Sequence, residues 1–277
     1  MRDQAQSDNE AYVRAVHDKG LAFDLSTMSR RRMLAAIGGA GALALVGGSL
    51  LDGTASAAAV ADAEAAACLA EVESETAGPF PADGSNGPNV RTLNGIVRSD
   101  IRSSFGGYVG TAAGVPLQFS LIVQNLSCKP LAGAAVYAWH CDRAGNYSLY
   151  SSAVTNQNYL RGIQVADATG KVTFTSIFPA CYSGRWPHIH FEVYKTLAYA
   201  TSGSGPIVKT SQIALPKEID DVVFQQPGYA QSIVNMRRIS LATDMVFGDD
   251  NAAREMATVT GNVTSGYAAT LTISVNA

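Results

Sequence analysis

The stretch Tyr182-Ser-Gly-Arg185-Trp-Pro-His188-Ile-His190 places a phenol, a guanidinium and two imidazoles close together in the chain. In a β-strand, side chains at i and i+2 point to the same face, so His188 and His190 would present both rings to one point. Neutral imidazole is the commonest nitrogen ligand for metals in proteins. The chain has 4 histidines in all, and this pair has a tyrosine and an arginine beside it, so two ordinary strand histidines are the weaker interpretation. The stretch predicts a metal site on a strand.

Glu192 lies two residues beyond His190, on the same face of the predicted strand. A chelate of His188, His190 and Glu192 around Fe(II), Mn or Zn is therefore an alternative that the residues alone leave open. Tyrosine donors in place of the carboxylate would favour Fe(III), because each phenolate neutralises one charge of the ion.

The chain beyond the first 60 or so residues has the pattern of an all-β protein. Short runs of β-branched and aromatic residues alternate with clusters of Gly, Asn, Asp and Ser, at spacings typical of β-sandwiches. Short helical or irregular cover is expected at Pro216–Val223 and Tyr229–Arg238. The sequence predicts a single β-sandwich domain over residues 90–277 whose loops build the metal site. The predicted strands are Val90–Val97, Val115–Asn125, Ala135–Cys141, Lys171–Ile177, His188–Tyr194, Ile207–Ala214 and Tyr267–Val275.

Five blocks of sequence carry a resemblance to a known family. In this order they resemble the intradiol ring-cleavage dioxygenases, the catechol and protocatechuate 3,4-dioxygenase type, and most closely their exported, twin-arginine-dependent branch. The resemblance runs from about Cys68 to the C-terminus. The blocks are Asn94-Gly-Ile-Val-Arg98-Ser-Asp100-Ile, Cys128-Lys-Pro-Leu-Ala-Gly-Ala-Ala-Val136, Trp139-His-Cys-Asp-Arg-Ala-Gly145-Asn-Tyr147-Ser, Tyr159-Leu-Arg-Gly-Ile-Gln164 and the Tyr182 to His190 stretch.

The resemblance implies a non-haem Fe(III) held by two tyrosines and two histidines, here Tyr147, Tyr182, His188 and His190. It implies that Arg185 is the active-site arginine, which stabilises negative charge on a bound catecholate. The implied reaction adds both atoms of O₂ to a catechol-type substrate and cleaves the ring between its two hydroxylated carbons, which gives a muconate-type diacid. His188 follows Tyr182 more closely than in the cytoplasmic catechol enzymes, so we expect a more open site.

Three other polar residues lie in these blocks. Arg161 and Gln164 are expected to shape the pocket, and His140 to be a structural histidine. A second hypothesis for the whole chain is a secreted binding module, similar to transthyretin-like sandwiches, with a structural or vestigial metal site. The presence of every ligand type together with Arg185 favours the enzyme.

Residues 1–57 have the pattern of an export signal. Ser29-Arg30-Arg31-Arg32 precedes an apolar run rich in Gly and Ala from Ala35 to Leu51, and Ala55-Ser56-Ala57 has the small residues of a cleavage site. Consecutive arginines before a weakly hydrophobic core predict twin-arginine export, with the twin-arginine translocase as a transient partner and a secreted mature protein. A membrane anchor is the weaker alternative, because Gly and Ala lower the hydropathy of the run. Residues 58–89 are expected to form an N-terminal helix, at Ala58–Leu69, and an extended linker.

The net charge and the four cysteines bear on the partners of the protein and on its disulfides. The formal net charge is −3, and without a Lys/Arg cluster after the signal nucleic acid is not expected as a partner. All four cysteines follow the signal and would lie in an oxidising compartment. Four cysteines allow three pairings, and the sequence does not fix the choice. We slightly favour a Cys141–Cys181 disulfide, because each of the two is close in sequence to a proposed ligand tyrosine. A zinc site is the weaker alternative for lack of a C-x-x-C pair. The oligomeric state stays open.

Overall fold

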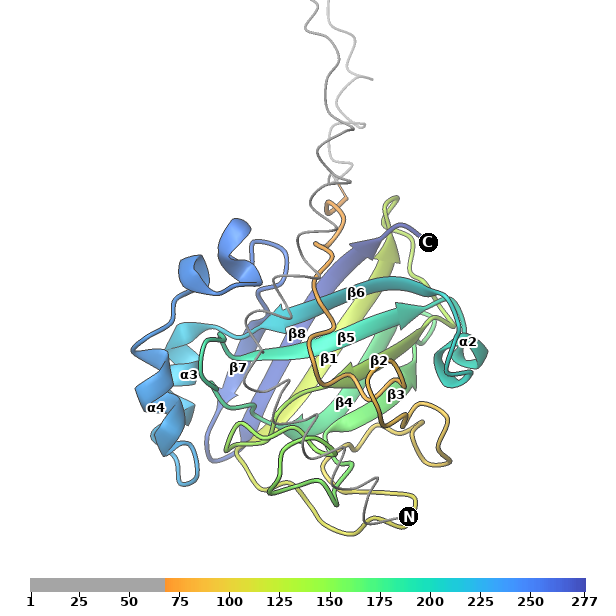
Figure 1. Cartoon of the computed structure of the whole chain (residues 1–277). Helices are drawn as coiled ribbons and strands as arrows, with labels where there is room; N and C mark the ends of the chain where they lie inside the picture. The colour runs from red at the N-terminus through yellow and green to blue at the C-terminus, as the bar shows by residue number, and fades with distance from the viewer. Residues whose placement is uncertain (1–67) are drawn as a thin grey trace, which may run out of the picture.

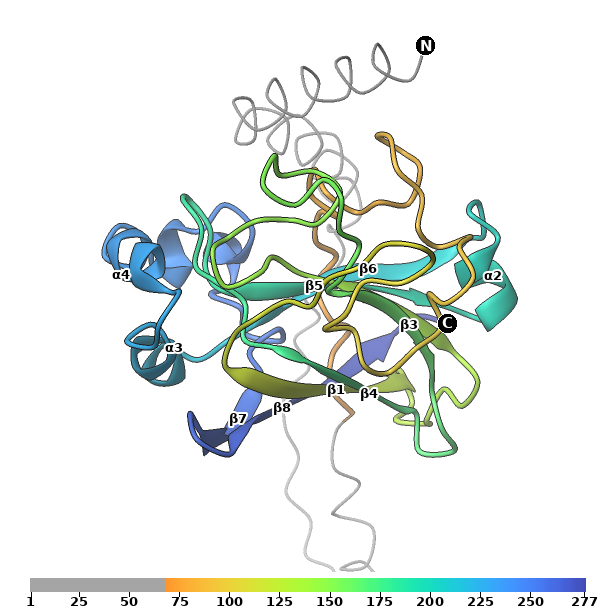
Figure 2. The same ribbon diagram turned by 90° about the horizontal axis from the view of Figure 1, so that it is seen from below.

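The computed structural model describes residues 68–277 (Figure 1). Within this range eight strands form two four-stranded sheets, which lie as two layers when the molecule is seen from below (Figure 2). The predicted all-β sandwich is confirmed. The predicted signal over residues 1–57 and the predicted helix at Ala58–Leu69, apart from its last two residues, lie outside the described residues.

The first sheet has the strand order β4-β1-β8-β7 and consists of β1 (Pro116–Asn125), β4 (Lys171–Ile177), β7 (Thr258–Asn262) and β8 (Gly266–Val275). β1 pairs antiparallel with β4 and parallel with β8, and β7 pairs antiparallel with β8. Alternate side chains of β1 point into the core and are at most 1% exposed: Leu117, Phe119, Leu121 and Val123. This period of two is why the sequence predicts the strand.

The second sheet is antiparallel throughout, with the strand order β3-β2-β5-β6. It consists of β2 (Ala135–Trp139), β3 (Arg161–Val165), β5 (His188–Tyr194) and β6 (Ile207–Ala214). All seven residues of β5 are buried. Ile189, Phe191 and Val193 pack into the main core between the sheets. The alternation of a strand therefore turns His188 and His190 to the outer face of this sheet, where loops cover them.

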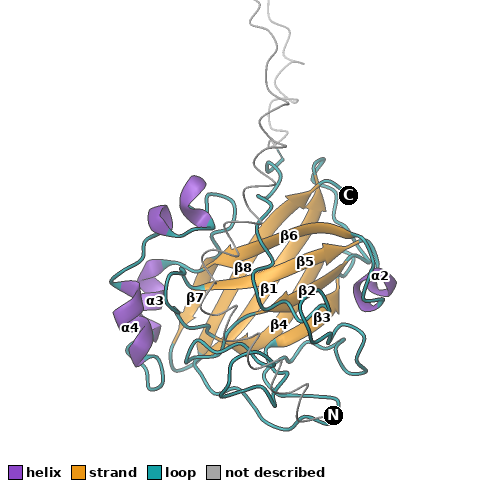
Figure 3. Cartoon of the chain, in the orientation of Figure 1, coloured by secondary structure: helices purple, strands orange, loops and turns teal. Residues whose placement is uncertain are grey.

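The helices lie at the periphery of the sandwich (Figure 3). They are α2 (Leu197–Thr201), α3 (Lys217–Val223), α4 (Ala230–Met236) and the 3₁₀ helices η1 (Leu241–Thr243) and η2 (Phe247–Asp249). All but α2 belong to the connection between β6 and β7. In residues 68–277 no helix is long and apolar enough to cross a membrane.

The predicted strand at Val90–Val97 is wrong. The chain turns there, with hydrogen bonds from Leu93 N to Val90 O and from Ile96 N to Leu93 O, and Gly95 has a left-handed φ of +98°. After the turns the chain connects the edges of the two sheets, because Val97 bridges to Ile163 of β3 and Asp100 bridges to Thr175 of β4. The sequence also misses β3, which begins with a charged residue, and β7, which is short and largely exposed.

The predicted Cys141–Cys181 disulfide is wrong as well. The disulfide joins Cys68 to Cys128, and Cys141 and Cys181 are free and buried. Cys128 lies in the turn after β1, and the segment that begins at Cys68 runs beside the end of β8, with Val72 N bonded to Ser274 O. Since the ends of β1 and β8 are neighbours, the bond ties the N-terminal segment to that end of the sheet.

Candidate metal centre

β5 carries two imidazoles on its outer face. His188 and His190 are each 2% exposed, and their Nε2 atoms lie 3.1 Å apart. The i, i+2 spacing therefore brings two nitrogen atoms to one point.

Two tyrosines approach the same point from different loops. Tyr147 follows β2, and its hydroxyl oxygen lies 3.3 Å from His188 Nε2 and 3.2 Å from His190 Nε2. Tyr182 follows β4, and its hydroxyl oxygen lies 3.3 Å from His188 Nε2. The loops touch at Gly145, where an added Cβ would lie 3.1 Å from the Cβ of Tyr182. Tyr147 is 1% exposed, whereas Tyr182 is only partly buried.

The protonation of His188 follows from its partners. Its Nδ1 lies 2.5 Å from the carbonyl oxygen of Trp186, which can only accept, so Nδ1 carries the proton. Burial first, and then the charge of Arg185, lowers the pKa of His188 well below its usual value. Burial and then His188 lower the pKa of His190 in the same way. Both rings are therefore neutral near pH 7, which is the form that binds metals. The lone pair of His188 Nε2 faces the donor cluster, which consists of the hydroxyl oxygens of Tyr147 and Tyr182 and the Nε2 atoms of His188 and His190.

These four side chains fit a ferric ion. Two donors bound to one first-row metal at about 2.1 Å each lie roughly 3 to 3.4 Å apart, and four of the six distances between the donor atoms here are 3.1 to 3.3 Å. Burial and then Tyr182 raise the pKa of Tyr147 well above its usual value, so in the absence of a cation this group is a neutral phenol. A cation would displace its proton, and two phenolates suit Fe(III) better than Fe(II).

The carboxylate alternative does not assemble. Glu192 is 1% exposed, and its carboxylate accepts a hydrogen bond from Tyr194 and pairs with Arg91 at 3.7 Å. Burial is the main reason that the pKa of Glu192 is raised to about 7. In the described part of the chain no three His, Cys, Asp or Glu side chains are grouped so that they could hold a metal. The chelate of His188, His190 and Glu192 is therefore not formed.

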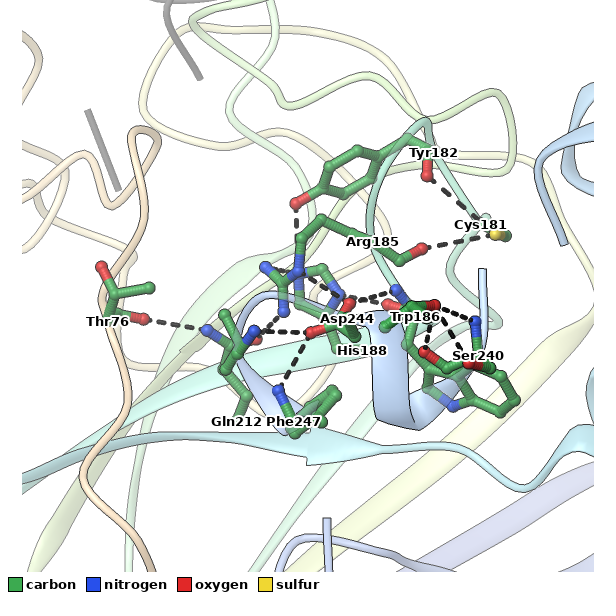
Figure 4. Close-up of polar contacts among 12 residues, drawn as sticks. Thr76, Cys181, Tyr182, Arg185, Trp186, His188, Gln212, Ser240, Asp244 and Phe247 are labelled. Carbon is green, nitrogen blue, oxygen red and sulfur yellow. Dashed lines mark hydrogen bonds and ion pairs between the residues drawn. The ribbon is translucent and has the colours of Figure 1, made fainter. Parts of the chain in front are cut away.

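Arg185 lies beside the cluster with a different partner on each guanidinium nitrogen (Figure 4). Its Nε donates to Asp244 Oδ2 at 3.0 Å, its Nη2 to Gln212 Oε1 at 2.7 Å, and its Nη1 to His188 Nε2 at 3.4 Å. Burial opposes the charged form, but Tyr182 and then Asp244 outweigh it and raise the pKa of Arg185. The guanidinium therefore stays charged although it is buried.

His190 is held by packing. Its Nδ1 has no hydrogen-bond partner among residues 68–277. Trp139, its neighbour across the β2–β5 pair, stacks on the ring at 5.0 Å between centroids and 3° between planes. Gly78 contacts the ring as well, because an added Cβ there would lie 3.2 Å from His190 Cε1. The segment that carries Gly78 is fixed by a 2.9 Å hydrogen bond from Gln212 Nε2 to Thr76 O.

The remaining predicted residues lie outside the donor cluster. Arg161 is 1% exposed and donates to Phe80 O and to both Oγ and O of Ser148, so it ties two loops together. Gln164 donates to the carbonyl of Ile163. His140 bonds Ser176 Oγ and the carbonyl of Cys141, each at 2.7 Å.

Four residues of the site were not predicted: Gly78, Trp139 as a stacking partner, Gln212 and Asp244. Gln212 and Trp139 could have been found from strand register, because both lie opposite His190. Asp244 is 59 residues from Arg185 in the chain, and no motif marks it.

Comparisons with known proteins agree with this geometry. A family model described as Dioxygenase matches residues 93–197, a range that contains Tyr147, Tyr182, Arg185, His188 and His190. Chlorocatechol 1,2-dioxygenase of Rhodococcus opacus is 38% identical over 66 residues, which are 24% of this chain and 26% of that protein. Catechol 1,2-dioxygenase 2 of Acinetobacter lwoffii is 44% identical over 55 residues, 20% of each chain. The matched stretches thus span about a quarter or less of these curated relatives.

A solved structure extends the likeness over most of the domain. An intradiol ring-cleavage dioxygenase from Tetranychus urticae matches with a TM-score of 0.58 and 25% identity, and the match covers 75% of this chain and 95% of that one. The family match over residues 93–197 and the similar fold of this solved structure point in the same direction. The chain resembles the intradiol ring-cleavage dioxygenases in sequence around the donor cluster and in fold over most of residues 68–277.

Proposed function

We propose that the protein is an exported non-haem Fe(III) dioxygenase that cleaves catechol-type aromatics between their two hydroxylated carbons, with O₂ as co-substrate. The observation that carries the proposal is the convergence of two phenol oxygens and two imidazole nitrogens beside a charged Arg185, in which each donor atom lies 3.1 to 3.3 Å from at least one other. A ferric ion at these donors would supply the Lewis acid that binds the catechol oxygens and draws electron density from the ring.

The four ligands would have different tasks. His188 and His190 are neutral donors through Nε2, and the buried Tyr147 is the phenolate least able to move. Tyr182 lies on the rim, partly exposed, next to the exposed Ser183 and Gly184. Its hydroxyl oxygen is therefore the group best placed to take up the proton that a catechol loses on binding.

Arg185 would stabilise the substrate anion. Its guanidinium is buried and charged and lies next to His188, so it meets the negative charge that develops on a bound catecholate. Because two of its three nitrogens are already fixed on protein acceptors, little further ordering is needed when the substrate binds.

Iron, activity and product can be tested together. The iron-loaded protein is expected to be red-brown, to consume O₂ with catechol or protocatechuate, and to give a ring-opened diacid that carries both atoms of ¹⁸O₂. No O₂ uptake and no ring-opened product from any catechol in a panel would contradict the proposal. A protein that also stays colourless after iron loading would favour the binding module.

Export rests on the sequence of residues 1–57. Replacing Arg30 and Arg31 with lysine is expected to stop export of the folded protein and leave the precursor inside the cell. Cell fractionation followed by immunoblotting measures this, with Arg2→Lys as the matched control. Equal export of both variants would contradict the twin-arginine route.

A further inference from the structure

The side chain of Asp244 is a buried carboxylate with all of its acceptor capacity used close to the cluster. The residue is 2% exposed. Its Oδ2 accepts from Arg185 Nε at 3.0 Å and from the backbone N of Trp186 at 2.6 Å, and its Oδ1 accepts from the backbone N of Val246 at 2.8 Å and of Phe247 at 3.0 Å. One carboxylate therefore connects the loop that carries Arg185 to the turn that enters η2 (Figure 4).

The backbone of Asp244 is itself fixed. It ends η1, and its N donates to the carbonyl of Ser240 at 2.9 Å. Ser240 caps this 3₁₀ turn reciprocally with Thr243, since the backbone N of Ser240 donates to Thr243 Oγ1 at 2.9 Å and the two hydroxyls lie 3.0 Å apart. The capped 3₁₀ turn therefore fixes the backbone from which the carboxylate of Asp244 extends.

Two nitrogens of the Arg185 guanidinium are held by protein acceptors, and only Nη1 faces the metal ligands. A guanidinium is planar, so holding Nε on Asp244 and Nη2 on Gln212 fixes the plane and leaves Nη1 directed at His188 Nε2. The lone pair of His188 Nε2 is the one that a metal at the cluster would use. Nη1 would then lose its acceptor and present its N–H groups to whatever oxygen lies at the cluster.

We propose that Asp244 is a positioning residue of the reaction: it fixes the guanidinium of Arg185 so that Nη1 faces the substrate oxygens. The inference rests on the proposed function and adds a residue to it. Asp244 lies beyond residues 93–197, the range of the family match. The same turn delivers a second contact, because the Phe247 ring lies 5.8 Å from Arg185 Cζ and 6.5 Å, edge-on, from the ring of His188.

The first test is a pair of variants on the iron-loaded protein. Asp244→Asn keeps the size of the side chain and removes its charge, and is expected to retain iron and colour, because no ligand is altered. We expect kcat to fall by about 100-fold, the size of effect seen when a positioned donor is lost, with KM changed by less than about threefold. The control is Asp221→Asn, whose partner Lys217 and whose own side chain are exposed; its kinetics should equal those of the parent.

A double-variant cycle separates positioning from general stability. If Asp244 acts through Arg185, then Asp244→Asn should lower kcat by less than about threefold in an Arg185→Met background. Added guanidinium chloride should partly restore the activity of Arg185→Ala, since Asp244 and Gln212 still line the vacated place. It should not restore the Arg185→Ala/Asp244→Asn double variant. Additive losses, or equal rescue of both variants, would overturn the proposal.

A structure of the iron-loaded parent protein with 4-nitrocatechol tests the inference without turnover and without a variant. Arg185 Nη1 is expected within hydrogen-bond distance of a ligand oxygen while Nε remains on Asp244. An Arg185 that has left Asp244, or an Nη1 turned away from the ligand, overturns the inference even in an active enzyme. A parent protein that cleaves no catechol overturns the proposed function, while this structure still decides the role of Asp244.

Discussion

The protonation and the partners of the side chains on the outer face of β5 decide which of them can bind a metal. His188 and His190 are two residues apart, and both rings are forced to the neutral form by burial. Glu192 follows at the same spacing, but Tyr194 and Arg91 occupy its carboxylate. The periodicity of a strand therefore selects a shared face, and the neighbours on that face decide which side chains can act as ligands.

Substitutions can separate these roles. Tyr147→Phe and Tyr182→Phe each remove one phenolate and are expected to change the visible charge-transfer band. His188→Ala and His190→Ala each delete a neutral donor and should weaken iron binding by at least about 100-fold. Glu192→Gln should leave iron content and colour unchanged. Metal analysis and absorption spectra measure all five variants. An empty site in Glu192→Gln together with an unchanged spectrum in Tyr147→Phe would restore the carboxylate chelate.

Gly78 offers a test of how the ring of His190 is held. Gly78→Ala is expected to shift that ring and lower iron occupancy, because the new Cβ would lie 3.2 Å from Cε1 and φ is +68°. Gly133→Ala is the matched control: its φ is +82°, but nothing lies within 4 Å of the added Cβ. Both variants pay about 1 to 2 kcal/mol of backbone strain in the free energy of unfolding. Equal iron content in the two would show that contact with Gly78 does not position the ring.

What the sequence predicts about the site depends on distance along the chain. The Tyr182 to His190 stretch is local, so strand periodicity alone brings its imidazoles together. Tyr147 needs the family resemblance, because nothing local indicates that its loop touches the Tyr182 loop at Gly145. Asp244 cannot be predicted in either way, since its role depends on a turn that only the folded chain brings to Arg185.

At the scale of elements, the strands that the sequence predicts are those whose two faces differ or are both buried. β1 alternates and β5 is buried throughout, so both stand out. Val90–Val97 has the composition of a strand but contains Gly95, whose left-handed φ starts a connection between sheet edges. β7 has mostly exposed residues and little apolar pattern, because it pairs with β8 at the edge of the sheet.

The disulfide adds a covalent bond to an N-terminal segment that also hydrogen-bonds to the sandwich, through Val72 N to Ser274 O and Glu75 N to Thr210 O. Cys68 and Cys128 are 60 residues apart, and closing a loop of that length is worth about 4 kcal/mol in the free energy of unfolding. Cys128→Ser should therefore lower stability in chemical denaturation by up to that amount and leave iron content intact, since Cys128 is not one of the four donors. Cys141→Ser is the control, because its thiol is free. Labelling the unfolded, unreduced protein should detect the thiols of Cys141 and Cys181 but not those of Cys68 and Cys128.

On the scale of the whole molecule, the second sheet is covered on both faces. One face meets the first sheet and the other is covered by loops and by the connection between β6 and β7. Burying a polar face in this way encloses acidic groups as well as ligands. Glu75 is 7% exposed and Glu255 is fully buried. Burial first, and then Asp249 and Glu255, raises the pKa of Glu75 to about 8.

This carboxyl group links stability to pH. In the unfolded chain Glu75 loses its proton near pH 4.5, while in the folded protein it keeps the proton up to about pH 8. The unfolded state therefore binds fewer protons between these values, and the free energy of unfolding falls as pH rises through this window. Glu75→Gln cannot ionise, so it should lose less stability between pH 5 and pH 8, by up to about 3 kcal/mol.

Urea denaturation of the metal-free protein at both pH values measures this difference, because bound iron would add its own pH dependence. The exposed Glu218→Gln on α3 is the control and should follow the parent protein. The readout is the change between the two pH values within each variant, so any constant cost of the amide cancels. If Glu75→Gln and the parent lose equal stability from pH 5 to pH 8, Glu75 is ionised in the folded protein at both pH values, and its burial does not make stability fall as the pH rises.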